Sequence, residues 1–282
     1  MGKIRYLAAI SKDPAALADF YVDEIGMRIM ARSDAGDVSL TDGYFNLTLF
    51  RRRADLMELR KDLGLHHMGM QVESIEDTLR KYRELVPGGI AVRELGGPHY
   101  GEVRIFDPEC NPISLSETAF GVKDGEHGFP RIGHIAIHTL QPQRSADFMT
   151  ALFDMRELGT TAERRSQGRF NCFMGDGDTN LALHPYYRTR DAEDFALYNR
   201  IGHDGQEEKP EERRYGIHHF GFLMRDAAQK AEQLSHGQAL VADRPAERPY
   251  AEYRVLDSEG NGFDLTQNKG WEVDVDTWVR VA

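Results

Sequence analysis

An internal repeat constrains the fold of this chain more than any other feature. GLHHMGMQV (64–72) matches GIHHFGFLM (216–224), and the long string at 98–117 matches the one at 249–267 in the same order. A shorter similarity relates ALADFYVDEIGMRIM to RSADFMTALFDMREL, again one in each half. Several ordered matches are the signature of a duplicated architecture. The sequence therefore predicts two similar halves.

Each half divides again into units with the order strand, helix and three strands. The run RYLAAIS alternates as a strand does. A helix is predicted over 13–25, with Asp13 as its N-cap and Pro14 at its first position. The next unit has a strand at 65–72 and a helix at 74–86. The four units begin near residues 4, 64, 131 and 214. The pattern predicts an α+β protein of four βαβββ modules.

The modules fall into two predicted domains, residues 1–119 and 131–282. Residues 118–130 are rich in glycine and charge and are predicted to form the linker between the domains. Residues 186–213 have no counterpart in the first half. This insertion is interpreted either as a lid over a site or as a surface excursion, and the sequence favours neither.

Composition excludes several classes of function. Forty-six acidic residues outnumber 35 basic ones, which gives a net charge of −11. With no basic run to offset this excess, nucleic acid and anionic membranes are not expected partners. No stretch of 18 apolar residues predicts a membrane span. The two cysteines, Cys110 and Cys172, have no CxxC spacing, and the N-terminus lacks a secretory pattern. A cytoplasmic protein with a small-molecule partner is expected.

The fourfold βαβββ pattern, with the strings GHIAIH (133–138), GIHHFGF (216–222) and DSEGNGFDL (257–265), resembles the vicinal oxygen chelate superfamily. That superfamily includes glyoxalase I, extradiol dioxygenases and bleomycin-resistance proteins. The resemblance covers nearly the whole chain. It implies that paired modules form two half-open barrels of eight strands each. It also implies metal ligands on the first and last strands of a module, and a possible homo-oligomer.

The resemblance places candidate metal ligands in the C-terminal half. These are His134, His219 and Asp264, while the fourth position holds Ala182, which cannot bind a metal. The equivalent positions of the N-terminal half hold Tyr6, Thr48, His67 and Ser114. That set lacks a carboxylate and has one imidazole. We therefore expect metal in the C-terminal domain and none in the N-terminal one.

Two imidazoles and one carboxylate form the facial triad typical of non-haem Fe(II) sites, with open positions for substrate and dioxygen. Fe(II) is the favoured cofactor, and the same ligands also accept Mn, Ni, Zn or Mg. A divalent cation with one carboxylate keeps about one net positive charge, so an anionic chelating substrate is expected.

Four further residues are candidates for catalysis. His138 shares a strand face with His134, and His184 shares one with Ala182, since residues i and i+2 lie on the same face. Either histidine could act as a base near neutral pH. Tyr250 and Tyr253 lie near the position where extradiol enzymes carry a substrate-binding tyrosine.

Strand alternation also predicts that some residues point away from this site. If Tyr253 faces the site, Arg254 faces away from it. His66 and His218, each next to a candidate inward-facing histidine, are likewise expected to face helices or solvent.

The favoured function is extradiol-type cleavage of a small aromatic diol. The extradiol signature is incomplete, because a histidine upstream of the tyrosine is missing and the last ligand is Asp264 in place of a glutamate. Two alternatives therefore stay open. One is an isomerase, epimerase or lyase that uses its metal to stabilise an enolate. The other is a binding protein of the same fold without catalysis.

Overall fold

The computed structural model describes residues 1–53, 63–93, 100–123, 128–166, 170–185, 216–237, 239–243, 251–267 and 271–274. The first module contains β1 (Lys3–Ser11), α1 (Pro14–Phe20), the π-helical turn η1 (Tyr21–Ile25), β2 (Arg28–Arg32), β3 (Val38–Thr41) and β4 (Asn46–Arg51). The second contains β5 (Gly64–Gln71), α2 (Ile75–Leu85), β6 (Val92–Arg93), β7 (Val103–Phe106) and β8 (Pro112–Ser116).

The third and fourth modules follow the same order. The third contains β9 (Arg131–Thr139), α3 (Pro142–Phe153), β10 (Arg156–Glu157), α4 (Gly159–Ser166), β11 (Cys172–Gly175) and β12 (Asn180–Pro185). The fourth contains β13 (Gly216–Leu223), α6 (Ala227–His236), β14 (Leu240–Asp243), β15 (Tyr253–Leu256) and β16 (Gly262–Thr266). The helix α4 was not predicted. The predicted fold class, α+β with four βαβββ modules, is confirmed.

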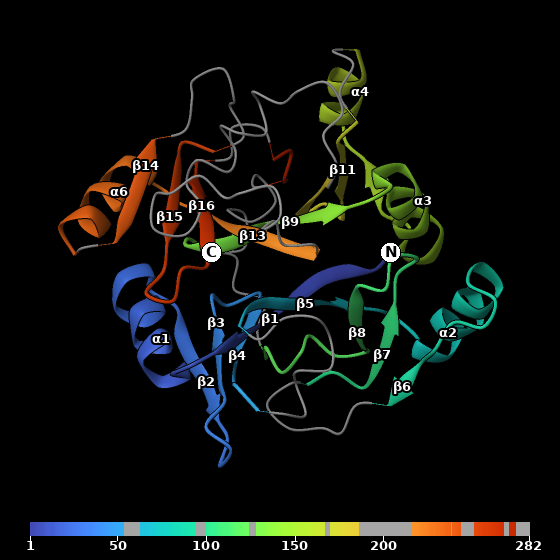
Figure 1. The fold of residues 1–282 in the computed structure, drawn as a ribbon, viewed down its shortest axis with the longest axis horizontal. Coiled ribbons are helices and arrows are strands. Elements are labelled where there is room, and N and C mark those ends of the chain that lie inside the picture. Colours follow the sequence, from blue (N-terminus) through green and yellow to red (C-terminus); the bar gives the residue numbers. More distant parts are fainter. Residues whose placement is uncertain are drawn as a thin grey trace.

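Each pair of modules forms one eight-stranded sheet, and the two sheets lie one above the other (Figure 1). The strand orders are β2-β3-β4-β1-β5-β8-β7-β6 and β10-β11-β12-β9-β13-β16-β15-β14. At the centre of each sheet, the first strands of the two modules pair antiparallel, β1 with β5 and β9 with β13. Each of these strands also pairs in parallel with the last strand of its own module. The sheets are half-open and do not close into barrels.

Capping residues fix where the helices begin. Asp13 accepts a hydrogen bond from the backbone N–H of Ala16, and Pro14 occupies the first position of α1. Ser74 and Asp226 cap α2 and α6 in the same way. The predicted helix 13–25 is α1 continued by η1. None of the helices within the described ranges is long and apolar enough to cross a membrane.

Alternation along the strands gives each sheet an apolar face and a more polar one. In β12, Leu181 and Leu183 join the main hydrophobic core. Ala182 belongs to a separate small cluster on the opposite face, and Asn180 and His184 share its parity. The main core contains residues of both sheets, so the apolar faces of the two sheets share one interior. The opposite faces remain available for polar chemistry.

The helices help to join the two halves. Tyr21 of η1 packs its ring near Phe220 and Phe222 of β13, and its hydroxyl donates a 2.8 Å hydrogen bond to the carboxylate of Asp257. On the other side of the molecule α2 packs against α3 (Figure 1). The ring of Tyr82 there lies edge-on to that of Phe148. The contact between the halves is therefore mainly apolar, with a few buried polar links.

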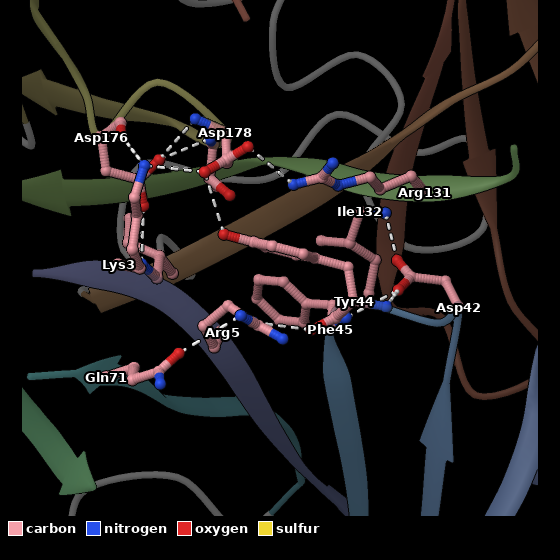
Figure 2. A network of polar contacts seen from close by, with 12 residues as sticks. Lys3, Arg5, Asp42, Tyr44, Phe45, Gln71, Arg131, Ile132, Asp176 and Asp178 are labelled. Carbon is pink, nitrogen blue, oxygen red and sulfur yellow. Dashed lines mark hydrogen bonds and ion pairs between the residues drawn. The ribbon is translucent and has the colours of Figure 1, made fainter. Parts of the chain in front are cut away.

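Two carboxylates, those of Asp42 and Asp176, join the halves reciprocally (Figure 2). Asp42, between β3 and β4, accepts the backbone N–H of Ile132 at 2.6 Å. Asp176, between β11 and β12, accepts the backbone N–H of Ile4 at 2.6 Å. The two carboxylates occupy equivalent turns of the repeat and each reaches the first strand of the other half. The duplication therefore extends to the interface itself.

Tyr44 lies at the centre of the same network. Its ring is sandwiched between the guanidinium groups of Arg5 and Arg131, each 3.7 Å from the ring centroid (Figure 2). Its hydroxyl donates to Asp178, which also pairs with Lys3 at 2.7 Å. Tyr44 and Arg131 are buried, and the opposite charges around them compensate one another.

Part of the predicted linker 118–130 packs into the N-terminal half. Phe120 is fully buried and stacks on Tyr6 of β1, so this portion packs into the N-terminal half. The insertion 186–213 lies outside the described residues.

Candidate metal centre

His134, His219 and Asp264 converge on the polar face of the C-terminal sheet. They lie on β9, β13 and β16, three strands that are adjacent at the centre of the sheet. In β16 the neighbours of Asp264 are Phe263 and Leu265, which point into the main core. Alternation therefore forces the carboxylate to the opposite face. The structure brings together the three residues that the sequence singled out.

The separations of the three side chains fit a common cation. The Nε2 atoms of His134 and His219 are 3.3 Å apart, and Nε2 of His219 is 3.4 Å from Oδ2 of Asp264. One donor atom from each residue lies within 4.8 Å of the other two. Donors about 2.1 Å from one cation stand roughly 3.0 to 3.4 Å apart in octahedral or tetrahedral geometry. Within the described ranges, this is the one such group of three or more potential donors.

Burial keeps the imidazole of His219 ready to bind a cation. Desolvation, followed by the positive charge of Arg254, holds the pKa of His219 well below its ordinary value of 6.5. Desolvation likewise holds the pKa of His218 well below 6.5, with nearby His138 as the next cause. Both rings are therefore neutral at pH 7, which is the form that coordinates a metal.

Arg254 faces this site, so the prediction that it points away was wrong. Cross-strand pairing sets Arg254 of β15 directly opposite Asp264 of β16. Its Nε donates to Oδ1 of Asp264, and its Nη2 donates to Oδ2 at 3.1 Å. Both residues are almost completely buried. The guanidinium therefore binds the carboxylate in a bidentate manner, with two hydrogen bonds, and compensates its charge.

Tyr253 lies on the other face of β15. It stands opposite Leu265 and packs against the main hydrophobic core. The structure thus does not bring its hydroxyl to the three clustered residues, because the register places its neighbour Arg254 there instead. Tyr250, the other predicted tyrosine, lies outside the described residues.

His138 and His184 both lie on the polar face near the triad. They are direct neighbours in the parallel pairing of β9 and β12, and their ring centroids are 6.3 Å apart. The ring of His184 is also 6.4 Å from that of His219 and nearly parallel to it. The structure therefore gathers both predicted base candidates beside the possible metal ligands.

His218 joins this group, contrary to the prediction that it faces helices or solvent. The pairing of β13 with β9 has a register shift between Ile217 and His219. At this bulge strict alternation is lost. The ring of His218 lies 4.4 Å from that of His138, and its Nδ1 is 2.8 Å from Nδ1 of His219. The N-terminal half repeats the feature, with Nδ1 of His66 2.7 Å from Nδ1 of His67.

The fourth position of the site is apolar. Ala182 lies opposite Ala136 in β9 and clusters with it, with Phe173 and with the partly buried Leu158. The methyl side chain of Ala182 has no atom that can bind a cation. The three convergent residues therefore leave one side of the site to apolar contacts.

Two residues of the site escaped the sequence analysis. Oδ1 of Asn180 lies 2.8 Å from Nδ1 of His134, and the indole of Trp271 stacks on the His134 ring with centroids 4.8 Å apart and planes 16° apart. The sequence did hold a signal for Trp271. An aromatic residue follows the last strand of each half, Phe120 after β8 and Trp271 after β16, and each stacks on the first strand of its own half.

The N-terminal equivalent of the site has a different composition. Arg104, the counterpart of Arg254, pairs with Ser114, where the C-terminal half has Asp264. Its Nη2 lies 3.3 Å from Nε2 of His67, and Tyr6 stands in the place of His134. The scaffold is duplicated, and the set of potential metal donors differs.

Comparison with known proteins identifies the family. The model of the Glyoxalase/Bleomycin resistance protein/Dioxygenase superfamily matches residues 3–115 and 131–265, and the chain belongs to this superfamily. No curated protein sequence matches the chain.

The solved structures with the same fold include a glyoxalase and two dioxygenases. The Mn(II)-bound glyoxalase from Novosphingobium aromaticivorans has a TM-score of 0.66 at 17% identity, over 97% of this chain and 84% of that one. The 2,3-dioxygenase LapB from Pseudomonas sp. KL28 has a TM-score of 0.65 at 13% identity, over 93% and 91%. Homoprotocatechuate 2,3-dioxygenase from Brevibacterium fuscum has a TM-score of 0.62 at 15% identity, over 93% and 70%.

Proposed function

We propose that this chain is a metal-dependent enzyme of the vicinal oxygen chelate type, in which His134, His219 and Asp264 bind one divalent cation, Fe(II) in the favoured case. The observation that carries the proposal is the convergence of the three donor groups at separations suited to one cation. The neutral state of His219 and the hydrogen bonds that hold the carboxylate of Asp264 in place support this proposal further. When bound, the cation would supply Lewis acidity and, as Fe(II), a path for electrons between a chelated diol and dioxygen.

The favoured reaction is extradiol-type cleavage of a small aromatic diol, because Ala182 leaves coordination positions free for such a substrate and dioxygen. The surrounding residues have roles consistent with this chemistry. Phe173 and the partly buried Leu158 cluster with Ala182 and would offer an apolar wall to an aromatic ring. Arg254 adds a positive charge that favours an anionic substrate.

His184 is placed to hold a proton. The amide nitrogen of Asn171 contacts Nδ1 of His184, and an amide nitrogen can only donate. Nδ1 is therefore the acceptor, and Nε2 carries the hydrogen. A neutral His184 in this tautomer can donate a hydrogen bond from Nε2–H to a developing negative oxygen and so stabilise its charge. His138 beside it is the candidate proton carrier in this proposal.

A non-redox isomerase or lyase is the second candidate function, and Arg254 is the observation that favours it. Its buried charge offsets that of Asp264, so a bound cation would keep more of its positive charge for an enolate. The position of Tyr253 in the core also removes one expected extradiol contact.

One experiment separates these candidates. Protein reconstituted anaerobically with Fe(II) is mixed with a panel of catechols and then with oxygenated buffer, while oxygen uptake and ring-cleavage absorbance are recorded. Uptake that matches product formation supports the dioxygenase. Turnover of α-hydroxy ketone or hemithioacetal substrates with Mn(II) or Zn(II) in the absence of oxygen supports the second candidate. Failure to retain any divalent metal contradicts both.

A further inference from the structure

The ring of His134 is held in place by two buried neighbours, Asn180 and Trp271. Its ring is held on one edge by Asn180, the residue beside it in the parallel pairing of β9 with β12. Its flat side lies against the indole of Trp271. Asn180 and Trp271 are themselves connected, because Nδ2 of Asn180 donates a 3.0 Å hydrogen bond to the backbone carbonyl of Trp271. The three residues are all nearly inaccessible to solvent.

This chain of hydrogen bonds has a fixed direction. A backbone carbonyl can only accept, so the group of Asn180 that faces Trp271 must be its NH₂. The amide oxygen of Asn180 then faces Nδ1 of His134, and Nδ1 must carry the hydrogen of a neutral ring. Nε2 of His134 is left with its lone pair, and this atom points toward Nε2 of His219. The backbone carbonyl of Trp271 therefore determines, through the amide of Asn180, which nitrogen of the His134 ring carries the hydrogen.

The N-terminal half provides an internal comparison. Asn46 occupies the place of Asn180, and its Nδ2 donates to the carbonyl of Phe120 at 2.7 Å. Phe120 stacks on Tyr6 at 4.8 Å with planes 18° apart, as Trp271 stacks on His134. The amide oxygen of Asn46, however, accepts a 2.8 Å hydrogen bond from the hydroxyl of Thr48. The link between asparagine and the aromatic residue is thus common to both halves and serves the fold.

The C-terminal half differs at the position of Thr48. The register of the two parallel pairs places Ala182 there, so no hydroxyl competes for the amide oxygen of Asn180. Ala182 therefore has a second consequence besides leaving the fourth position without a donor. It frees the acceptor that His134 uses.

From these contacts we infer that Asn180 is a positioning residue that fixes His134 in the tautomer with hydrogen on Nδ1 and directs the bare Nε2 toward the cation site. The inference rests on the proposed metal site for its functional meaning. The tautomer itself is a property of the metal-free protein. Partners of this kind, which hydrogen-bond to the far nitrogen of a metal-binding histidine, fix its orientation and raise its affinity for the metal.

The test uses three variants of the full chain and two measurements. Asn180→Leu removes both hydrogen bonds. Asn180→Asp keeps an acceptor for His134 and loses the donor to Trp271. Asn46→Leu is the matched control, because it breaks the equivalent link to Phe120 in the other half. The two measurements are long-range ¹H–¹⁵N NMR of the metal-free protein, which reports the tautomer of His134, and calorimetric titration with Mn²⁺.

The expected results distinguish positioning from a merely structural role. In the wild-type protein His134 carries hydrogen on Nδ1. In Asn180→Leu the ring moves toward the Nε2–H tautomer and Mn²⁺ affinity falls by about 10- to 100-fold. Asn180→Asp binds Mn²⁺ at least as tightly as the wild type. Asn46→Leu loses stability comparable to that lost by Asn180→Leu and keeps wild-type Mn²⁺ affinity.

Two results would overturn the inference. One is hydrogen on Nε2 of His134 in the wild-type protein. The other is equal Mn²⁺ affinity in Asn180→Leu and Asn46→Leu. Failure of the proposed function is a different result, in which the wild-type protein binds no Mn²⁺ although His134 has the Nδ1–H tautomer. That outcome would support the tautomer assignment and contradict the metal site.

Discussion

Each residue of the candidate site has a partner that limits how it can move. Asp264 accepts hydrogen bonds from Arg254. His134 contacts Asn180 through Nδ1 and stacks on Trp271, and Nδ1 of His219 contacts Nδ1 of the adjacent His218. Such support is what keeps ligand geometry within the narrow range that a metal requires. The chemistry of the site thus depends on partners outside the three candidate ligands.

The first prediction concerns the candidate ligands. His219→Ala should remove a donor and weaken Mn²⁺ binding by at least 10-fold, because two remaining donors hold a divalent ion poorly. The matched control is His67→Ala, which truncates the equivalent residue of the N-terminal half. Titration of both variants with Mn²⁺ checks this. Equal affinities in the two variants would contradict the assignment of the metal to the C-terminal half.

A second prediction concerns Arg254. Its replacement by methionine leaves the buried carboxylate of Asp264 without its charge partner, which should lower the free energy of unfolding by about 3–5 kcal/mol. Saturating Mn²⁺ should restore part of this loss, because the cation compensates the same charge. Urea unfolding with and without Mn²⁺ measures both quantities. Identical Mn²⁺-induced stabilisation in the variant and the wild type would argue against shared use of the carboxylate.

At the scale of elements, alternation and register decide which side chains meet. The two central strands of the C-terminal sheet contribute His134 and His219, and the adjacent β16 contributes Asp264. Close packing of Trp271 depends on the strand beneath it. A Cβ atom at Gly221 would lie 2.4 Å from the indole Cη2 atom of Trp271. Gly221 in β13 therefore provides the space in which the indole lies.

This packing yields a third prediction. Gly221→Ala should displace the indole of Trp271 and lower the free energy of unfolding by about 1–3 kcal/mol. It should also loosen His134 and weaken Mn²⁺ binding. Gly262→Ala in β16 is the control, because a Cβ atom there would meet nothing closer than 3.7 Å. Thermal melts and Mn²⁺ titrations check both variants, and an unperturbed Gly221→Ala would refute this role of the glycine.

Much of this arrangement could be predicted from the sequence, because the repeat fixes the order of the elements and the family resemblance indicates the three residues that the structure brings together. The faces of individual side chains were less predictable. The orientation of His218 was not predicted, because a bulge at the start of β13 interrupts the alternation of side chains. No residue type in the sequence indicates this bulge. Tyr253 and Arg254 were assigned to the wrong faces because cross-strand register, which sets Arg254 opposite Asp264, depends on tertiary pairing. Asn180 gained its role only from contacts with segments distant in sequence.

At the scale of the whole molecule, the two halves are joined by reciprocal links. Glu259 accepts the backbone N–H groups of Lys12 and Asp13, and Glu109 accepts those of Leu140 and Gln141. Each glutamate belongs to the turn before the last strand of its half and caps the loop that follows the first strand of the other half. The site in the C-terminal sheet therefore rests on a scaffold whose halves support each other.

The fourth prediction concerns the pH dependence of this scaffold. Burial raises the pKa of Asp176 from 3.8 to about 6, against the lowering effect of its N–H donors. The folded state therefore binds more protons than the unfolded state between these values, so the contribution of Asp176 to stability is full below pH 4 and is lost as pH rises through 6. The loss amounts to about 3 kcal/mol. Unfolding free energies from pH 4 to 7 should show this negative slope, and Asp176→Asn should remove it. A slope unchanged in the variant would contradict the prediction.

We propose that His134, His219 and Asp264 hold one divalent cation in the C-terminal half, and anomalous diffraction from crystals of the full chain soaked in Mn²⁺ can locate it. We expect one strong peak about 2.1 Å from Nε2 of each histidine and from Oδ2 of Asp264. Absence of a peak among these three atoms in fully soaked crystals, or a peak in the N-terminal half instead, would contradict it.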